Sequence, residues 1–298
     1  MVSCSLLVVN CFLSDRENFS LLPFHSIMIE AKNIIVQIGD KKLVRDVSMN
    51  IIPGKFSVIL GKNGAGKSTF LKTLTGDMKP TSGEIFVEGR RLESIQYQHL
   101  ARKRAVMMQN ATLAFSFTAL EVVLMGRIPH SRGFETPRDQ KIARECMKQA
   151  GVDHLMDRNF PTLSGGEKQR VQFARMLAQL WDRIEEKRPC CLMLDEPLSS
   201  LDLSYQHTIM HLVKRLSRKN VAVLMILHDL NLAAQYADEI NIMKDGRTFA
   251  LGAPNDVFKR EIIEMAFDCP VHIMQHPHYQ CPLIIAAKQE EKSFLSAV

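Results

Sequence analysis

The sequence predicts an α/β fold in which a parallel sheet core carries an N-terminal antiparallel β-subdomain and an inserted helical lobe. Short apolar runs of strand length recur along the chain, and several end in glycine-rich or acidic loops. Segments with helical spacing separate these runs, which is typical of parallel strands covered on both faces by helices. Within residues 115–182 the strand pattern stops and helical segments follow one another, which indicates the lobe.

The first part of the predicted domain consists of strands. Apolar stretches at residues 34–38, 47–52 and 56–60 have strand length. Gly39 and Gly54, each beside a second turn-forming residue, separate them. We therefore expect an antiparallel β-subdomain whose last strand leads into the core.

Two further strands are expected before the lobe, at residues 84–88 and 105–108. Helical spacing then covers residues 118–125 and 138–149, and a long helix is expected to begin near Glu167. These helices make up the predicted lobe.

The core resumes after the lobe. Strands are expected at residues 191–194 and 221–227, separated by a helix at residues 203–216. The apolar residues that share one face of this helix are Ile209, Leu212, Val213 and Leu216. Residues 239–278 predict a mixture of strands and helices.

We expect the domain to span residues 28–286, between an N-terminal extension at residues 1–27 and a C-terminal tail at residues 287–298. The extension has a short apolar patch at residues 6–9 but no preceding positive charge, so it is a poor secretory signal. We expect it to be disordered or spurious upstream sequence, with Met28 as the functional start.

Size and composition exclude several classes of protein. The 298 residues suffice for one large α/β domain with a lobe, and no apolar run approaches the roughly 20 residues of a membrane-spanning helix. The formal net charge of +6 comes without any basic run interleaved with aromatic residues, so nothing indicates nucleic-acid binding. The seven cysteines include no C-x-x-C pair, which is typical of reduced thiols in the cytosol.

A phosphate-binding loop follows the strand at residues 56–60. Residues 61–68 match the pattern G-x-x-x-x-G-K-[ST], with a strand before them and a helix after them. Backbone N–H groups of such a loop point at one phosphate, Lys67 reaches the β- and γ-phosphates, and the Ser68 hydroxyl binds Mg²⁺. The expected ATP-binding residues are Gly61, Lys62, Asn63, Gly64, Ala65, Gly66, Lys67, Ser68 and Thr69. The core is therefore predicted to be a P-loop NTPase-type sheet.

Two acids end the apolar strand at residues 191–194. Acids at the end of so apolar a strand favour a cationic partner, and the Mg²⁺ of the phosphate loop would be that partner. Asp195 is then expected to hold the metal and Glu196 to polarise a water for attack on the γ-phosphate. The alternative is a strand-end turn closed by Pro197.

Residues 163–167 read Leu-Ser-Gly-Gly-Glu and resemble the signature sequence of ATP-binding-cassette ATPases. Gln109 resembles the glutamine of their Q-loop, residues 200–202 resemble their D-loop, and His228 resembles their switch histidine. All the motifs occur in the order of that family, and the resemblance covers about residues 29–286.

The resemblance implies a homodimer with two shared ATP sites. Its signature residues, Ser164, Gly165, Gly166 and Glu167, would cap a helix and bind the γ-phosphate held by the other subunit. Two copies would pack head to tail about a two-fold axis. The resemblance also assigns Gln109 to the Mg²⁺ site, Asp202 to the D-loop and His228 to the catalytic group beside Glu196.

One position departs from the family. An aromatic residue usually stacks on the adenine from the strand before the phosphate loop, and Ile38 stands at the matching position. Isoleucine gives apolar contact without stacking. We therefore expect weak selectivity between purine bases.

Several segments resemble one branch of importers, which handles iron chelates and cobalamin: residues 113–118, 122–130 and 228–234. Within that branch, residues 171–189 and 205–207 resemble the haemin-importer ATPases. The likeness implies two transmembrane permease subunits, a periplasmic binding protein, and a place at the cytoplasmic face of the bacterial inner membrane. Membrane contact would come only through the permease, and no nucleic acid is involved.

Four alternatives remain open at this stage. The cargo could be a ferric siderophore or cobalamin in place of haem. A soluble cassette protein of DNA repair or translation would carry a coiled-coil insertion, a zinc insertion or a second cassette, and a GTPase would carry N-K-x-D; the sequence shows none of these. The cysteines and histidines at residues 269–281 either form a metal or haem site or belong to a turn between two strands, and their spacing favours the turn.

Overall fold

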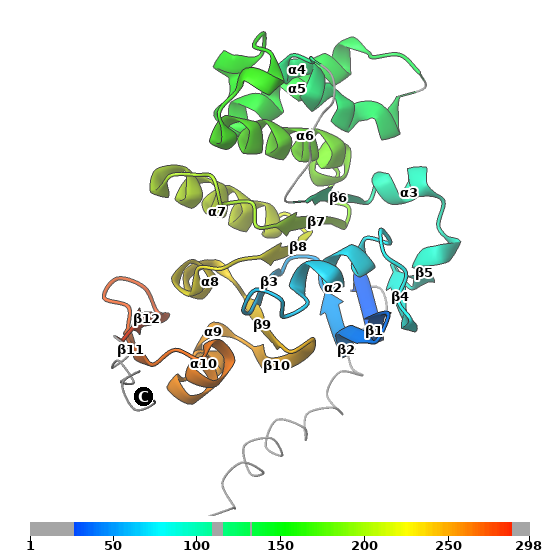
Figure 1. Cartoon of the computed structure of the whole chain (residues 1–298). Coiled ribbons are helices and arrows are strands. Elements are labelled where there is room, and N and C mark those ends of the chain that lie inside the picture. The colour runs from blue at the N-terminus through cyan, green and yellow to red at the C-terminus, as the bar shows by residue number, and fades with distance from the viewer. Residues whose placement is uncertain (1–26, 109–115, 132, 288–298) are drawn as a thin grey trace, which may run out of the picture.

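The computed structural model describes residues 27–108, 116–131 and 133–287. The predicted extension and C-terminal tail therefore lie almost wholly outside the described residues. A central sheet is flanked by an N-terminal sheet on one side and by a helical lobe, drawn in green, on the other (Figure 1).

The N-terminal sheet is antiparallel throughout, with strand order β2-β1-β4-β5. Its strands are β1 (Ile29–Ile38), β2 (Lys41–Ile51), β4 (Ser82–Val87) and β5 (Arg90–Arg91). A short 3₁₀ turn (Leu92–Ser94) and α3 (Tyr97–Ala101) then lead to the core. The predicted antiparallel subdomain is confirmed.

The central sheet has the strand order β10-β9-β3-β8-β7-β6. Its strands are β3 (Phe56–Leu60), β6 (Arg104–Met107), β7 (Cys190–Asp195), β8 (Val221–Ile226), β9 (Glu239–Lys244) and β10 (Arg247–Gly252). All neighbours pair in parallel except β10, which pairs antiparallel with β9. The parallel core is confirmed, and its edge is an antiparallel hairpin.

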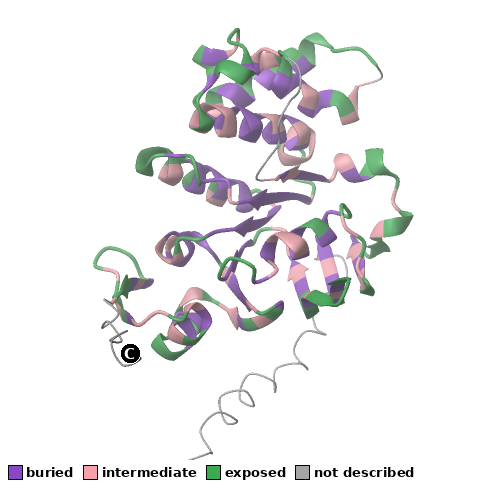
Figure 2. Cartoon of the chain, viewed as in Figure 1, coloured by how far each residue is buried: buried purple, intermediate pink, exposed green. Residues whose placement is uncertain are grey.

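Both faces of the central strands are covered. Every residue of β3, β7 and β8 is buried, so these strands appear purple in Figure 2. Val58 and Ile59 belong to different apolar clusters, because successive side chains of a strand point to opposite faces. One cluster lies toward the lobe and α7 (Leu203–Ser217), and the other lies toward the N-terminal sheet and α2 (Lys67–Leu74).

The lobe is built on α4 (Ala119–Leu124), α5 (Pro137–Gln149) and α6 (Gly165–Glu185), with a 3₁₀ segment (Met125–His130) after α4 and two 3₁₀ turns (Asp153–Leu155 and Phe160–Thr162) before α6. Each α-helix begins with a capping box, in which the cap side chain and the third helical side chain bond each other's backbone N–H. Because of this cap, α6 begins at Gly165, two residues before the expected position.

The C-terminal part consists of α8 (Leu230–Tyr236), α9 (Pro254–Val257), α10 (Arg260–Phe267) and a hairpin of β11 (Val271–Gln275) and β12 (Pro282–Ala286). The side chain of Asn231 on α8 bonds both backbone groups of Ile284 on β12, at 2.8 and 3.1 Å. The hairpin confirms the predicted turn at residues 276–278. Among the described residues, no group of histidines, cysteines and acids is placed to hold a metal ion, and no described helix is suited to cross a bilayer.

Candidate functional site

Three neighbouring strands place the candidate site. β8 lies between β3 and β7 in the sheet, and all three strands are parallel. The phosphate loop follows β3, the acids end β7 and His228 follows β8. The carboxyl ends of adjacent parallel strands are where open α/β sheets bind ligands, so the sequence motifs meet at one edge.

Glycine is required at two points of the phosphate loop. A Cβ added to Gly61 would lie 2.3 Å from the carbonyl oxygen of Met243, and one added to Gly66 would lie 2.5 Å from that of Leu43. Gly66 also has a φ of 96°, in the left-handed region that favours glycine. Glycine at these two positions therefore lets the loop pack closely against the backbone of Met243 and Leu43.

The side chain of Lys67 folds back onto this loop. Its side chain is only 5% exposed, and its Nζ donates to the carbonyl oxygens of Gly61 and Lys62 at 2.8 and 3.1 Å. Burial lowers the pKa of Lys67, while the carboxylates of Glu196 and Asp195 oppose that shift. A buried ammonium ion whose hydrogen bonds go to neutral carbonyls is well suited to a phosphate oxygen.

Two of the three residues expected to bind Mg²⁺, Ser68 and Asp195, come together. The Ser68 hydroxyl donates to Oδ1 of Asp195 at 3.2 Å, and Asp195 is 2% exposed. Burial raises the pKa of Asp195, although the hydrogen bond from Ser68 opposes it. A hydroxyl and a buried carboxylate form the oxygen donor set that Mg²⁺ prefers, so these residues fit the ion.

Glu196 and His228 form the second pair. Nε2 of His228 lies 2.5 Å from Oε1 of Glu196. Glu196 has a φ of 50°, and its backbone N–H donates to the carbonyl oxygen of Ile226 at the end of β8. The turn after β7 thus carries Glu196 over β8, where the carboxylate meets the imidazole.

The signature residues lie at the start of α6 and not on the phosphate loop. Ser164 caps α6, and its Oγ accepts from the backbone N–H of Glu167 at 3.3 Å, while Glu167 accepts from the backbone N–H of Ser164 at 2.8 Å. α6 lies in the lobe, away from α2, which follows the phosphate loop (Figure 1). One chain therefore does not bring its signature to its own phosphate loop.

The remaining predicted residues lie in different parts of the chain. Gln109 lies outside the described residues. Asp202 caps α7, and its Oδ1 accepts from the backbone N–H of Tyr205 at 3.0 Å. Ile38 ends β1 and is 58% exposed, so its side chain is accessible for apolar contact. One contact had no signal in the sequence: Lys62 of the phosphate loop pairs with Asp268, after α10, at 2.7 Å.

Comparisons with known proteins show the family to which the chain belongs. A family model described as ABC transporter matches residues 44–199. The hemin import ATP-binding protein HmuV of Gloeobacter violaceus is 48% identical, over 87% of this chain and 94% of its own length. That of Methylobacillus flagellatus is 42% identical, over 90% of this chain and all of its own length. This chain belongs to the ABC transporter family.

Solved structures of ABC transporters share the fold. An inward-facing transporter of the metal-chelate type matches with a TM-score of 0.73 at 24% identity, over 88% of this chain and 98% of the matched chain. A dimeric bacterial ABC transporter cassette matches with a TM-score of 0.67 at 30% identity, over 76% of this chain and 98% of its own. The predicted fold class and family resemblance are confirmed.

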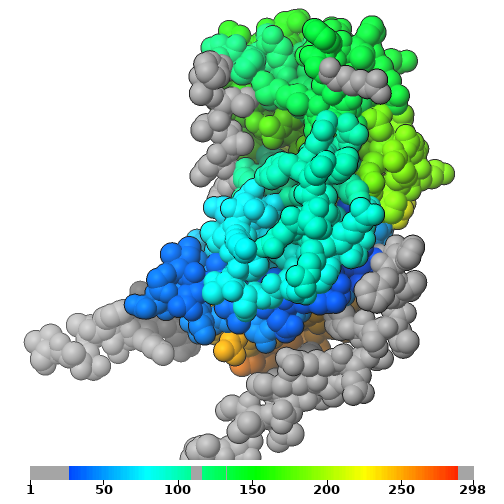
Figure 3. Space-filling view, turned by 90° about the vertical axis from the view of Figure 1, so that its right-hand side faces the viewer, coloured from blue at the N-terminus to red at the C-terminus, as the bar shows by residue number. Residues whose placement is uncertain are grey.

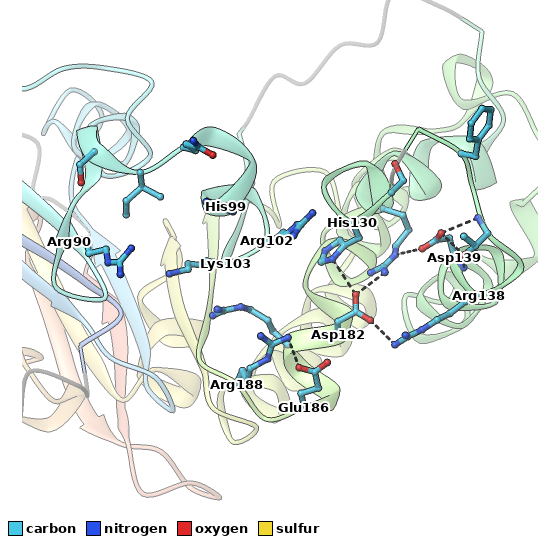
Figure 4. A pocket seen from close by; sticks show the side chains of 18 residues that line it. Arg90, His99, Arg102, Lys103, His130, Arg138, Asp139, Asp182, Glu186 and Arg188 are labelled. Carbon is cyan, nitrogen blue, oxygen red and sulfur yellow. Dashed lines mark hydrogen bonds and ion pairs between the residues drawn. The ribbon is translucent and has the colours of Figure 1, made fainter.

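This ABC family member also has a large groove between core and lobe, with a volume of about 1110 Å³. Figure 3 shows that face, with the cyan segment around α3 below the green lobe. Arg90, His99 and Arg102 line the core side, while His130 and Arg138 line the lobe side (Figure 4). Seven arginines and lysines line the groove against three acids, so it is basic.

An ion-pair network forms the lobe wall of the groove. Asp182 accepts from Arg127 and Arg138, each at 2.8 Å, and lies 3.3 Å from the imidazole of His130. Arg127 is 4% exposed and also bonds Asp139 at 2.9 Å. The network joins the 3₁₀ segment after α4 to α5 and α6 (Figure 4). Sequence reasoning did not identify it, because its members lie far apart along the chain.

Proposed function

We propose that this chain is the ATP-hydrolysing subunit of a bacterial haem importer. The observation that carries the proposal is the meeting of Lys67, the Ser68–Asp195 pair and the Glu196–His228 pair at adjacent strand ends. Together they provide a phosphate cradle, a metal site and a polarising carboxylate, which are the parts that phosphoryl transfer to water requires.

Nucleotide and metal would bind to residues already in place. The triphosphate would lie in the loop at residues 61–68, with Lys67 exchanging its carbonyl partners for phosphate oxygens. Ser68 and Asp195 would hold Mg²⁺, and Gln109 would complete its shell. When bound, Mg²⁺ supplies positive charge to the phosphate oxygens. Its charge would also favour the ionised form of Asp195.

Glu196 would polarise the attacking water, and His228 would hold its carboxylate. The contact of 2.5 Å with His228 holds one carboxylate oxygen of Glu196 in place, and an ionised carboxylate can accept a hydrogen bond from water. Because Asp195 contacts Ser68 and Glu196 contacts His228, the two acids serve separate tasks.

The functional unit would be a homodimer. Ser164, Gly165, Gly166 and Glu167 lie at the start of α6, away from the phosphate loop of the same chain, so a second copy must supply them. The helix start presents free N–H groups to a phosphate. The dimeric cassette that this chain resembles supports this arrangement.

Two permease subunits would hold the dimer at the cytoplasmic face of the inner membrane, each through one basic groove. The groove lies between core and lobe, so a segment seated in it contacts both parts and senses their relative movement. A periplasmic binding protein would deliver the cargo to the permease. Haem is the proposed cargo because the relatives are hemin import ATP-binding proteins at 42–48% identity.

The test uses the assembled system. The ATPase is reconstituted with its permease in liposomes, and binding protein loaded with haem, a ferric siderophore or cobalamin is added in turn. We expect haem-loaded protein to stimulate ATP hydrolysis most and haem to cross the bilayer. Stimulation by siderophore or cobalamin alone would refute haem and retain the ATPase. Absence of any ATP hydrolysis would refute the enzyme assignment.

A further inference from the structure

The start of α6 packs directly against the loop between Glu196 and α7. A Cβ added to Gly166 would lie 3.0 Å from the carbonyl oxygen of Ser200, and Gln169 donates to the hydroxyl of Ser199 at 3.3 Å. The signature helix and the loop that leads away from Glu196 are therefore in contact within one protomer.

Arg170 lies one turn beyond Gly166 on α6 and is buried, with no ion pair to a carboxylate among the described residues. It is 7% exposed, and its Nε and Nη1 have no hydrogen-bond partner among the described residues. Its guanidinium carbon lies 3.8 Å from the centre of the Tyr205 ring. A buried guanidinium is costly, and attraction to the face of an aromatic ring offsets part of that cost.

Tyr205 belongs to the first turn of α7 and also holds the loop. Its backbone N–H donates to the Asp202 carboxylate at 3.0 Å, and the next residue, Gln206, donates to the carbonyl oxygen of Leu201 at 3.1 Å. Tyr205 thus connects two elements: its backbone bonds Asp202, and its ring contacts the signature helix through Arg170.

We propose that Tyr205, stacked on Arg170, is a positioning residue that couples the two ATP sites of the dimer. The inference rests on the proposed head-to-tail dimer. There, Ser164 of one chain acts in the partner's site, whereas Glu196 of the same chain acts in its own. The stack connects the helix that carries Ser164 to the loop that follows Glu196. A movement of Glu196 in one ATP site would therefore move Ser164 in the other site.

The test replaces the ring of Tyr205 with a smaller apolar side chain. The Tyr205→Leu variant of the full chain, assembled with its permease, is compared with the parent and with Tyr205→Phe, which retains the ring. For Tyr205→Leu we expect the Hill coefficient for ATP to fall from about two toward one and the turnover to fall about tenfold. Binding of a fluorescent ATP analogue to the dilute, monomeric chain should not change, because Tyr205 is not part of the phosphate loop. Tyr205→Phe should match the parent.

A second variant, Arg170→Lys, keeps the charge and loses the planar stack, and we expect the same loss of cooperativity. It carries the test if Tyr205→Leu fails to fold, which thermal unfolding will show. If the parent is cooperative and a folded Tyr205→Leu or Arg170→Lys variant keeps its Hill coefficient and turnover, the coupling is refuted and the dimer is retained. An equal loss of cooperativity in Tyr205→Phe also refutes the coupling, because that variant keeps the ring. A parent that hydrolyses ATP as a monomer with a Hill coefficient of one refutes the dimer, and the coupling with it.

Discussion

At the scale of single residues, the conformation after β7 allows two adjacent acids to act separately. Asp195 ends the strand and accepts the Ser68 hydroxyl, while Glu196 has a φ of 50° and contacts His228. Left-handed backbone is unfavourable for most residues other than glycine, asparagine and aspartate. Its presence at Glu196 is therefore consistent with a requirement for side-chain placement, in agreement with the role proposed for this residue.

Replacing Glu196 with glutamine tests that role. The amide keeps the shape of the side chain but is a poor proton acceptor, so Glu196→Gln should bind ATP and lose about 10²–10⁴ in turnover. Phosphate release measures the turnover, and size-exclusion chromatography with ATP should show the dimer accumulating. Glu93→Gln, an exposed carboxamide control, should hydrolyse as the parent does. Near-parental turnover in Glu196→Gln would remove it from the mechanism.

Ile38 gives a second prediction at this scale. Because isoleucine offers no ring to the base, ATP and GTP should bind with similar affinity. Ile38→Tyr should tighten ATP binding by about 0.5–1.5 kcal/mol, the energy that stacking adds beyond buried area. Isothermal calorimetry with both nucleotides measures this, and Ile38→Leu serves as the aliphatic control. A strong native preference for ATP, unchanged in Ile38→Tyr, would show that another residue holds the base.

At the scale of elements, local pattern located most strands and helices. β3, β7 and β8 are buried on both faces, so each reads as an unbroken apolar run. The start of α6 was misplaced by two residues, although the spacing of Ser164 and Glu167 is that of a capping box. That spacing would have corrected it.

Contacts between distant elements could not be predicted. The Lys62–Asp268 pair joins the phosphate loop to the end of α10, and the Arg170–Tyr205 stack joins α6 to α7. Such pairs depend on how elements pack, and neither periodicity nor a motif records packing. The chemistry of the site was predictable because its motifs follow strand ends, whose positions the sheet fixes.

The division of one ATP site between two elements of different chains can be tested by mixing variants. Lys67→Ala removes the phosphate-loop cation and Ser164→Arg blocks the signature cap, so each variant alone should be inactive. A mixed dimer carries one intact site and one doubly altered site, so mixing should restore part of the ATPase activity. Failure to restore activity, with dimer formation shown by crosslinking, would contradict shared sites.

At the scale of the whole molecule, the basic groove is where core and lobe can be contacted together (Figure 3). Its lobe wall is braced by the buried Arg127–Asp139 pair, while Arg138 is 68% exposed. Removing Arg138 leaves Asp182 paired with Arg127. The exposed charges can therefore be changed without breaking the ion pairs of Arg127.

Reversing two of these outer charges should weaken attachment to the permease. Arg138→Glu combined with Arg188→Glu should reduce co-purification with the permease, most clearly at low salt, because surface electrostatics are screened as ionic strength rises. ATP hydrolysis by the free subunit should not change. Arg218→Glu with Lys219→Glu, on another face, is the charge-matched control. Undiminished co-purification of the groove variant would argue against this groove as the attachment site.

The phosphate loop closes against residues that are translated much later. The backbone N–H of Gly246 donates to the carbonyl oxygen of Ala65 at 3.1 Å, Met243 abuts Gly61, and β9 pairs with β3. Contacts of such sequence separation form late in folding. During synthesis, a nascent chain therefore carries its phosphate loop long before that loop can adopt its native curl. A product truncated before β9 would lack the contacts that shape its phosphate loop.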